Sequence, residues 1–197
     1  MIKIYWKPNP GKQTLALTRT EDEILYGGAR GGGKTEAGIV WMVEPDYVKH
    51  PKYKGLVVRE NAKDLADWLD RAERMYLPLK ANRTGNPATF SFPSGAIIRT
   101  GHLNDKNAYR QYQGHEYHKM LIEELTHIAQ EKNYEALLGS NRSTVQELKP
   151  QVFNTTNPDG PGHEWVKARF DCEHPDIQPR QFFDEETKIT NTRIFDP

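Results

Sequence analysis

The chain has 197 residues, which is enough for one α/β domain with a hydrophobic core and tight for two. Basic and acidic residues balance at 27 each, so the near-zero net charge argues against a protein that coats nucleic acid by bulk electrostatic attraction, although a local contact is still allowed. A single cysteine, Cys172, excludes an internal disulfide, and no apolar run approaches the roughly 18 to 20 residues that cross a bilayer. We therefore expect one soluble domain in a reducing cytosol, with no membrane partner.

Residues 1–23 are polar and interrupted by Pro8, Pro10 and Gly11, which predicts an extended arm lying against the domain. Gln13 stands out in this arm, because its amide offers both a donor and an acceptor and can read the edge of an adenine. A solvated loop glutamine is equally compatible with the local sequence, so both interpretations stay open.

The stretch LYGGARGGGKT at residues 25–35 contains the phosphate-binding pattern of Gly28, four residues, Gly33, Lys34 and Thr35. A short apolar strand at residues 24–26 precedes it and a helix at 36–44 follows, which is the context that this P-loop (Walker A) motif requires. Lys34 is expected to reach the phosphates of ATP and Thr35 to hold Mg²⁺. The alternative is a glycine-rich turn with an incidental lysine. Residues expected around the nucleotide are Gln13, Gly28, Ala29, Arg30, Gly31, Gly32, Gly33, Lys34, Thr35 and Glu36.

The next segments predict a layered α/β arrangement. The unbroken apolar run at 56–58 indicates a strand covered on both faces, and the helical spacing of apolar residues at 65–76 indicates a core helix. Residues 89–100 alternate, turn and alternate again, which predicts a β-hairpin, and residues 104–113 predict a helix ending at Gly114. A solvated face, rather than a DNA groove, is the favoured interpretation of the basic residues Lys49, Lys52, Lys54 and Arg59.

An apolar strand at 117–122 delivers two adjacent acids, Glu123 and Glu124, at its carboxyl end, where open α/β sheets bind ligands. We assign Glu123 to Mg²⁺ together with Thr35, and Glu124 to polarising the attacking water. The alternative is that both acids cap a following helix, where carboxylates are favourable in any case.

The remaining elements complete a core at residues 24–172. A helix at 131–138 and a strand at 152–153 are expected, and the strand leads into Thr155, Thr156 and Asn157, which would lie beside the γ-phosphate and respond to its loss. A polar turn is the alternative for these three residues. A further helix is expected at 163–170, whereas residues 173–197 are charged and proline-rich without periodicity and are expected to form an extension or linker.

This order of elements predicts an α/β P-loop NTPase of the additional-strand, catalytic-glutamate type, with a mainly parallel sheet flanked by helices and an added antiparallel hairpin. The chain resembles the N-terminal ATPase domain of the large terminase subunit of tailed bacteriophages. The resemblance runs from about Pro8 to Trp165 through KQTLAL, GGARGGGKT, FSFPSGAIIRTG, YQGHEYHKMLIEELTH and TTNPDGPGHEWV. The family usually has Asp-Glu where this chain has Glu123-Glu124, so the longer first acid changes the reach to the metal.

The resemblance implies a Mg²⁺-dependent ATPase that translocates double-stranded DNA into a procapsid, in a homo-oligomeric ring with the portal protein and the small terminase subunit as partners. It implies the host cell cytoplasm during assembly and not the mature virion. It also implies an arginine at the γ-phosphate, either Arg30 in cis or Arg142 in trans, and both can instead be surface residues. The nuclease domain of the family lies downstream of the ATPase domain, so we expect this chain to be a separate ATPase domain or a truncated product. A small-molecule phosphotransferase and a nucleotide-binding assembly module without turnover remain as alternatives.

Overall fold

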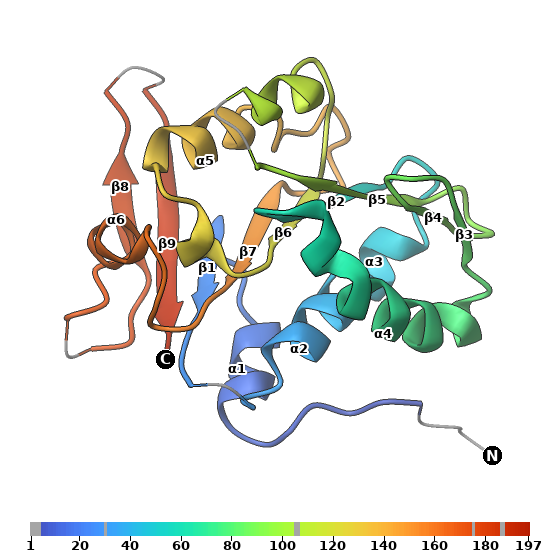
Figure 1. Ribbon diagram of the computed structural model, residues 1–197, viewed down its shortest axis with the longest axis horizontal. Coiled ribbons are helices and arrows are strands. Elements are labelled where there is room, and N and C mark those ends of the chain that lie inside the picture. The colour runs from blue at the N-terminus through green and yellow to red at the C-terminus, as the bar shows by residue number, and fades with distance from the viewer. Residues whose placement is uncertain (1–4, 30, 105–106, 175, 186–187) are drawn as a thin grey trace.

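The computed structural model describes residues 5–29, 31–104, 107–174, 176–185 and 188–197. They form one sheet with the strand order β3-β4-β5-β2-β6-β7-β1-β9-β8 (Figure 1). The strands are β1 Glu23–Tyr26, β2 Lys54–Arg59, β3 Asn82–Thr84, β4 Thr89–Ser91, β5 Ile97–His102, β6 Lys119–Ile122, β7 Gln151–Thr155, β8 Arg180–Phe183 and β9 Thr190–Asp196.

Helices pack on both faces of this sheet, with α2 and α4 on one side and α5 on the other (Figure 1). The α-helices are α1 Lys12–Leu17, α2 Lys34–Trp41, α3 Pro45–Val48, α4 Ala66–Tyr76, α5 Glu131–Leu138 and α6 His163–Arg169. Short 3₁₀ helices are η1 Ala62–Leu65, η2 Leu77–Leu79, η3 Ala108–Tyr112 and η4 Leu125–His127. No helix in the described ranges is both long enough and apolar enough to span a membrane.

The six central strands, from β5 to β9 in the sheet order, are parallel to one another, whereas β3, β4 and β8 join the sheet in antiparallel pairs. The predicted mainly parallel sheet with an added hairpin, here β4–β5, is therefore confirmed. Because parallel strands align their carboxyl ends, the ends of β1, β2, β6 and β7 lie along one edge of the sheet.

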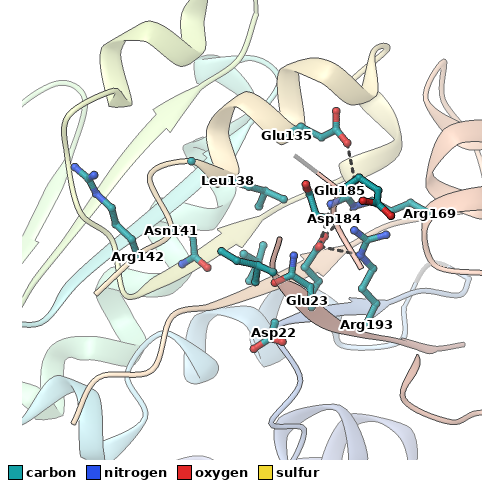
Figure 2. Close-up of a pocket in the computed structure, with 14 residues that line it drawn as sticks. Asp22, Glu23, Glu135, Leu138, Asn141, Arg142, Arg169, Asp184, Glu185 and Arg193 are labelled. Atoms are coloured by element: carbon teal, nitrogen blue, oxygen red, sulfur yellow. Dashed lines mark hydrogen bonds and ion pairs between the residues drawn. The ribbon is translucent and has the colours of Figure 1, made fainter. Parts of the chain in front are cut away.

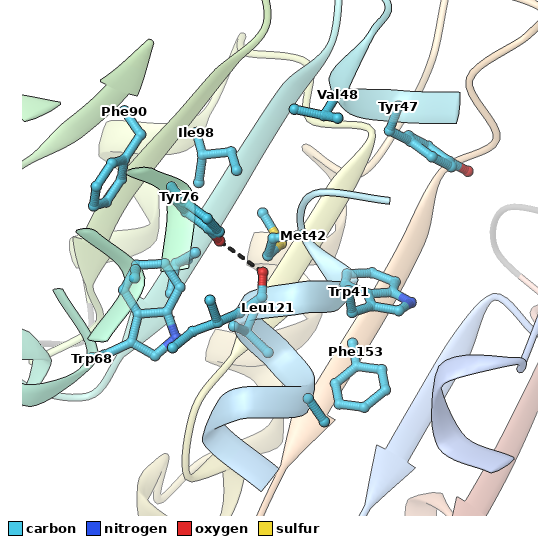
Figure 3. Packing of buried hydrophobic residues seen from close by; sticks show 14 of the residues in the cluster. Trp41, Met42, Tyr47, Val48, Trp68, Tyr76, Phe90, Ile98, Leu121 and Phe153 are labelled. Carbon is cyan, nitrogen blue, oxygen red and sulfur yellow. Dashed lines mark hydrogen bonds between the residues drawn. The ribbon is translucent and has the colours of Figure 1, made fainter. Parts of the chain in front are cut away.

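Alternation along the buried strands produces two hydrophobic cores. On β2, Val57 faces the core under α2 and α4, while Leu56 and Val58 face the core under α5 and α6. In the first core, Tyr76 of α4 donates a hydrogen bond of 2.8 Å to the carbonyl oxygen of Ile39 in α2 (Figure 3). This bond fixes the helix that follows the P-loop against the helix packed beside it.

Three segments differ from the sequence-based expectation. The arm at 1–23 is not wholly extended, because it contains α1. Within the described part of the helix expected at 104–113, the structure has the short 3₁₀ helix η3 in place of an α-helix. The predicted core boundary at residue 172 is wrong, because β9 lies in the sheet directly beside β1. The residues of β9 show no apolar periodicity, and ion pairs such as that of Arg193 with Glu23 at 3.0 Å help to hold the strand beside β1.

Candidate nucleotide-binding site

The P-loop leaves the carboxyl end of β1 and ends at the amino terminus of α2. Gly33 precedes α2 with φ at 72°, a left-handed backbone that favours glycine, so the turn into the helix depends on this residue type. The Tyr26 hydroxyl donates a hydrogen bond of 2.9 Å to the carbonyl oxygen of Gly32 and braces the loop from the preceding strand. Arg30 lies outside the described residues, so its predicted role stays a prediction.

Lys34 folds back over its own loop. Its ammonium group donates to the carbonyl oxygens of Gly28 at 2.9 Å and Ala29 at 2.8 Å. Burial lowers the pKa of Lys34, and the negative charges of Glu124 and Glu123 act in the opposite direction. The ammonium group of Lys34 is thus held in the loop by two carbonyl oxygens, which phosphate oxygens can replace.

A polar cleft of about 480 Å³ opens over the P-loop, a volume in the range of small-molecule sites. It is lined by Asn9, Gly31, Gly32, Gly33, Lys34, Thr35, Glu36, Arg71, Glu124 and Asn157. The structure thus brings together most of the predicted P-loop residues, the second acid of β6 and one residue of the coupling segment.

Glu123 lies below this cleft and is 3 % exposed. The Thr35 hydroxyl donates to Glu123 Oε2 at 3.4 Å, while the buried Oε1 has no hydrogen-bond partner within the described ranges. Burial raises the pKa of Glu123 to about 7; the charge of Arg59 opposes this shift and that of Glu124 adds to it. A hydroxyl and a carboxylate oxygen without a partner form an oxygen donor set that fits Mg²⁺, so Thr35 and Glu123 are the residues that would hold it.

Glu124 has left-handed backbone geometry, with φ at 58°, just after β6. Its carboxylate pairs with Arg59 Nη2 at 2.8 Å and lies 3.1 Å from His127 Nε2. Arg59 also donates to the carbonyl oxygen of Asp64. The interpretation of Arg59 as part of a solvated face is therefore wrong: its side chain is 20 % exposed and holds the predicted catalytic acid.

The predicted coupling residues connect this acid to β7. Thr155 Oγ1 accepts a hydrogen bond of 3.3 Å from the backbone N–H of Glu124. The Thr156 hydroxyl lies 2.8 Å from that of Thr126 in η4, and Asn157 lines the cleft. The end of β7 is thus bonded to the segment that carries the acid and also reaches the cleft. The response of these residues to the γ-phosphate stays a prediction.

Gln13 is 3 % exposed and belongs to α1, so it is not a solvated loop residue. Its side-chain oxygen accepts from the Asn9 backbone N–H at 2.6 Å, and Nε2 donates to the carbonyl oxygen of Gly33 at 2.9 Å. One N–H and one lone pair of the amide remain after these bonds. Contact with an adenine stays a prediction, whereas contact with the P-loop is observed.

Arg142 lies away from the cleft. Its neighbour Asn141 bonds to the carbonyl oxygen of Tyr117, at the amino end of β6, so Arg142 is at the opposite edge of the sheet from the P-loop. Figure 2 shows it beside a cavity of about 700 Å³ that also contains the buried pair of Glu23 and Arg169. This larger cavity is remote from the predicted chemistry, and within its own chain Arg142 cannot act at the P-loop, so a role in trans stays a prediction.

The sequence-based prediction missed several residues of the site, namely Asn9, Tyr26, Arg59 and Arg71. For Arg59 a signal existed, because it follows an apolar strand and therefore lies at the same sheet edge as Glu124. Arg71 comes from α4, and nothing in its local sequence distinguishes it from a solvated helix arginine.

A glycine loop between the strand β1 and the helix α2, together with a parallel strand, β6, that lies beyond β7 in the sheet and leads into two acids, defines a P-loop NTPase. The family described as "Terminase large subunit, T4likevirus-type, N-terminal" matches residues 25–194, and the chain belongs to this family. No curated protein matches the chain.

Solved structures share this fold. The large terminase of a thermophilic bacteriophage, in its crystal form 2, has a TM-score of 0.66 at 19 % identity, covering 85 % of this chain and 43 % of that one. The same protein in complex with ADP has a TM-score of 0.62 at 20 % identity, covering 82 % and 42 %. The Thermus phage P74-26 large terminase ATPase domain has a TM-score of 0.57 at 14 % identity, covering 79 % and 66 %. The chain thus spans less than half the length of the first of these terminases.

Proposed function

We propose that this chain is the ATP-hydrolysing motor domain of a phage terminase large subunit, which drives double-stranded DNA into a procapsid. The observation that carries the proposal is the position of Glu124, which faces the P-loop cleft beside the paired Thr35 and Glu123. Membership of the terminase family and the ADP complex of the thermophilic phage terminase support it.

The residues of the cleft have distinct tasks in this proposal. Lys34 leaves the carbonyl oxygens of its loop for the β- and γ-phosphates, so its ammonium group has oxygen partners both before and after the nucleotide binds. Thr35 and Glu123 hold Mg²⁺, which when bound neutralises charge on the phosphate oxygens. Glu124 orients the attacking water and accepts its proton once the carboxylate is free of Arg59 and His127.

The fold suggests how hydrolysis is linked to movement. Thr155 bonds to the backbone of Glu124, and Asn157 reaches the cleft, so loss of the γ-phosphate changes the contacts at the end of β7. We include in the proposal a homo-oligomeric ring on the capsid, with the portal protein and the small terminase subunit as partners in the host cell cytoplasm. Arg142, at the edge away from the P-loop, would act on a neighbour's site.

ATP turnover of the purified chain, measured with and without double-stranded DNA, tests the proposal. Replacing the acid in Glu124→Gln should lower turnover by roughly a hundredfold or more while ATP still binds. Lys34→Ala should weaken ATP binding itself. Glu73→Gln, an exposed acid on α4, is the matched control and should match the wild type.

Two results would contradict the proposal. Unchanged turnover in both the Glu124 and the Lys34 variants would remove the catalytic assignment. Transfer of the γ-phosphate to a small-molecule acceptor rather than to water would instead identify a phosphotransferase.

A further inference from the structure

The carboxyl end of β9 lies against the start of the P-loop. Asp196 is aligned with Tyr26, the last residue of β1, and its carbonyl oxygen accepts a hydrogen bond of 2.8 Å from the Gly27 N–H. The Phe195 ring covers Gly27 so closely that a Cβ there would lie 2.6 Å from a ring carbon. The first residue of the loop is therefore fixed by β9.

The side chain of Asp196 points to a different element. Its carboxylate is buried, with 1 % of the residue exposed, and accepts two hydrogen bonds from Arg19, at 2.9 Å from Nε and 2.7 Å from Nη2. Such a two-bond pair between planar groups fixes orientation as well as distance. Arg19 follows α1 directly, after the terminal residue Thr18.

The other end of α1 reaches the end of the same loop. Gln13 donates to the carbonyl oxygen of Gly33, 2.9 Å away, immediately before α2. The two ends of the P-loop, Gly27 and Gly33, are thus joined outside the loop through β9, the pair of Asp196 and Arg19, and α1. A shift of α1 changes the position of Gln13 relative to the loop.

We propose that Arg19 and Asp196 are positioning residues that hold helix α1 against the P-loop and thereby set the affinity and base selectivity for the nucleotide. The inference rests on the proposed function, in which this cleft binds ATP. The effect on affinity and base selectivity follows from the two parts of the nucleotide: the P-loop would hold the phosphates, and α1 would present the amide of Gln13 to the base. The pair keeps these two sides at a fixed separation.

A purely structural role for this pair makes a different prediction, and β9 supplies a matched control. Arg193 is on the same strand and pairs with Glu23 at 3.0 Å, at the opposite end of β1. Removing this pair should lower stability without changing nucleotide binding. Removing the pair of Arg19 and Asp196 should change both.

The experiment compares Arg19→Gln, Arg19→Lys, Asp196→Asn and Arg193→Gln with the wild type. Binding of ATP, GTP and inorganic tripolyphosphate is titrated by calorimetry, and urea unfolding reports stability. We expect Arg19→Gln and Asp196→Asn to weaken ATP binding by about tenfold, as for loss of a charge-assisted hydrogen bond. The preference for ATP over GTP should narrow, while tripolyphosphate binding should change by less than about threefold because the loop itself remains. Arg19→Lys, which keeps the charge, should fall between these variants and the wild type.

One outcome would overturn the positioning role alone. In it, Arg19→Gln and Asp196→Asn bind ATP as tightly as the wild type and keep its ratio of ATP to GTP affinity, while they lose stability as Arg193→Gln does. Absence of ATP binding in the wild type would overturn the proposed function as well. If Asp196→Asn does not fold, the two Arg19 variants still decide, since Arg19 is at the partly exposed side of the pair.

Discussion

Lys119 provides a test of the electrostatics of the sheet that is independent of the nucleotide site. It is the first residue of β6, is fully buried, and places its ammonium group 4.0 Å from the centre of the Trp41 ring and 4.3 Å from that of Tyr47. It also donates to the Trp41 carbonyl oxygen at 3.1 Å and pairs with Glu44. Burial lowers the pKa of Lys119 to about 8, although the charge of Glu44 acts in the opposite direction.

The sign and size of the effect on stability follow from this pKa. Between pH 8 and 10.5 the unfolded chain binds more protons at this lysine than the folded chain, so Lys119 makes stability rise with pH across that window. The difference between a pKa of about 8 and the ordinary value of 10.5 corresponds to about 3 kcal/mol of folding free energy that is missing at pH 7 and recovered above pH 10.5. Lys119→Met keeps the volume and removes the titration.

Urea unfolding of the wild type and Lys119→Met at pH 7, 8, 9 and 10 measures this effect. The free energy of unfolding of the variant, minus that of the wild type, should fall by roughly 2 to 3 kcal/mol from pH 7 to pH 10. Tyrosines and other lysines titrate in both proteins and cancel in the difference. Parallel pH profiles for the two proteins would refute the assignment of a depressed pKa to this buried lysine.

Three further predictions concern single contacts. Arg59→Gln should raise DNA-free ATP turnover and reduce stimulation by DNA, because it removes a 2.8 Å ion pair that holds Glu124; unchanged basal turnover would show that this pair does not restrain the acid. Gly27→Ala should cost about 1 to 3 kcal/mol of stability through its clash with Phe195, and adding Phe195→Leu should restore most of it; equal losses in the single and double variants would contradict the clash. Glu23→Gln should cost about 3 kcal/mol or more by urea unfolding at pH 7, because it leaves the buried Arg169 and the partly buried Arg193 with less counter-charge. Burial alone raises the pKa of Glu23, but its arginine partners hold this pKa below the ordinary value, so the stability that the carboxylate contributes is lost as the pH falls. If the free energy of unfolding fell with decreasing pH in the same way in Glu23→Gln and the wild type, this assignment would be wrong.

The sequence reveals those parts of the site in which the functional side chains and the backbone pattern that positions them lie within the same few consecutive residues. The P-loop needs glycines, a lysine and a hydroxyl within a few consecutive residues, and the acids Glu123 and Glu124 directly follow an apolar strand. The boundaries of α5 were likewise predicted correctly, because its apolar spacing and flanking polar residues lie within the same short segment.

What the sequence did not reveal depends on contacts between distant segments. β9 joins the sheet through partners such as Glu23 and Asp22 that lie about 170 positions earlier, so its own residues carry no strand signal. Gln13 was predicted to be a site residue, but its bond to Gly33 requires α1, which is too short to predict from periodicity. Arg59 was misassigned because its ion pair with the acid exists only after β2 and β6 are aligned.

The charged groups of the cleft are engaged with other groups of the protein. Lys34 is held by carbonyl oxygens of its own loop, and Glu124 by Arg59 and His127, so both groups have partners within the chain. Polyphosphate binding replaces the first set of contacts directly, because phosphate oxygens and carbonyl oxygens compete for one ammonium group. It does not by itself release Glu124, whose partners come from β2 and η4. Under the proposed function, binding and hydrolysis are therefore expected to be separable steps, and we expect the second to need a movement at the ends of β2, β6 and β7, which share one edge of the sheet.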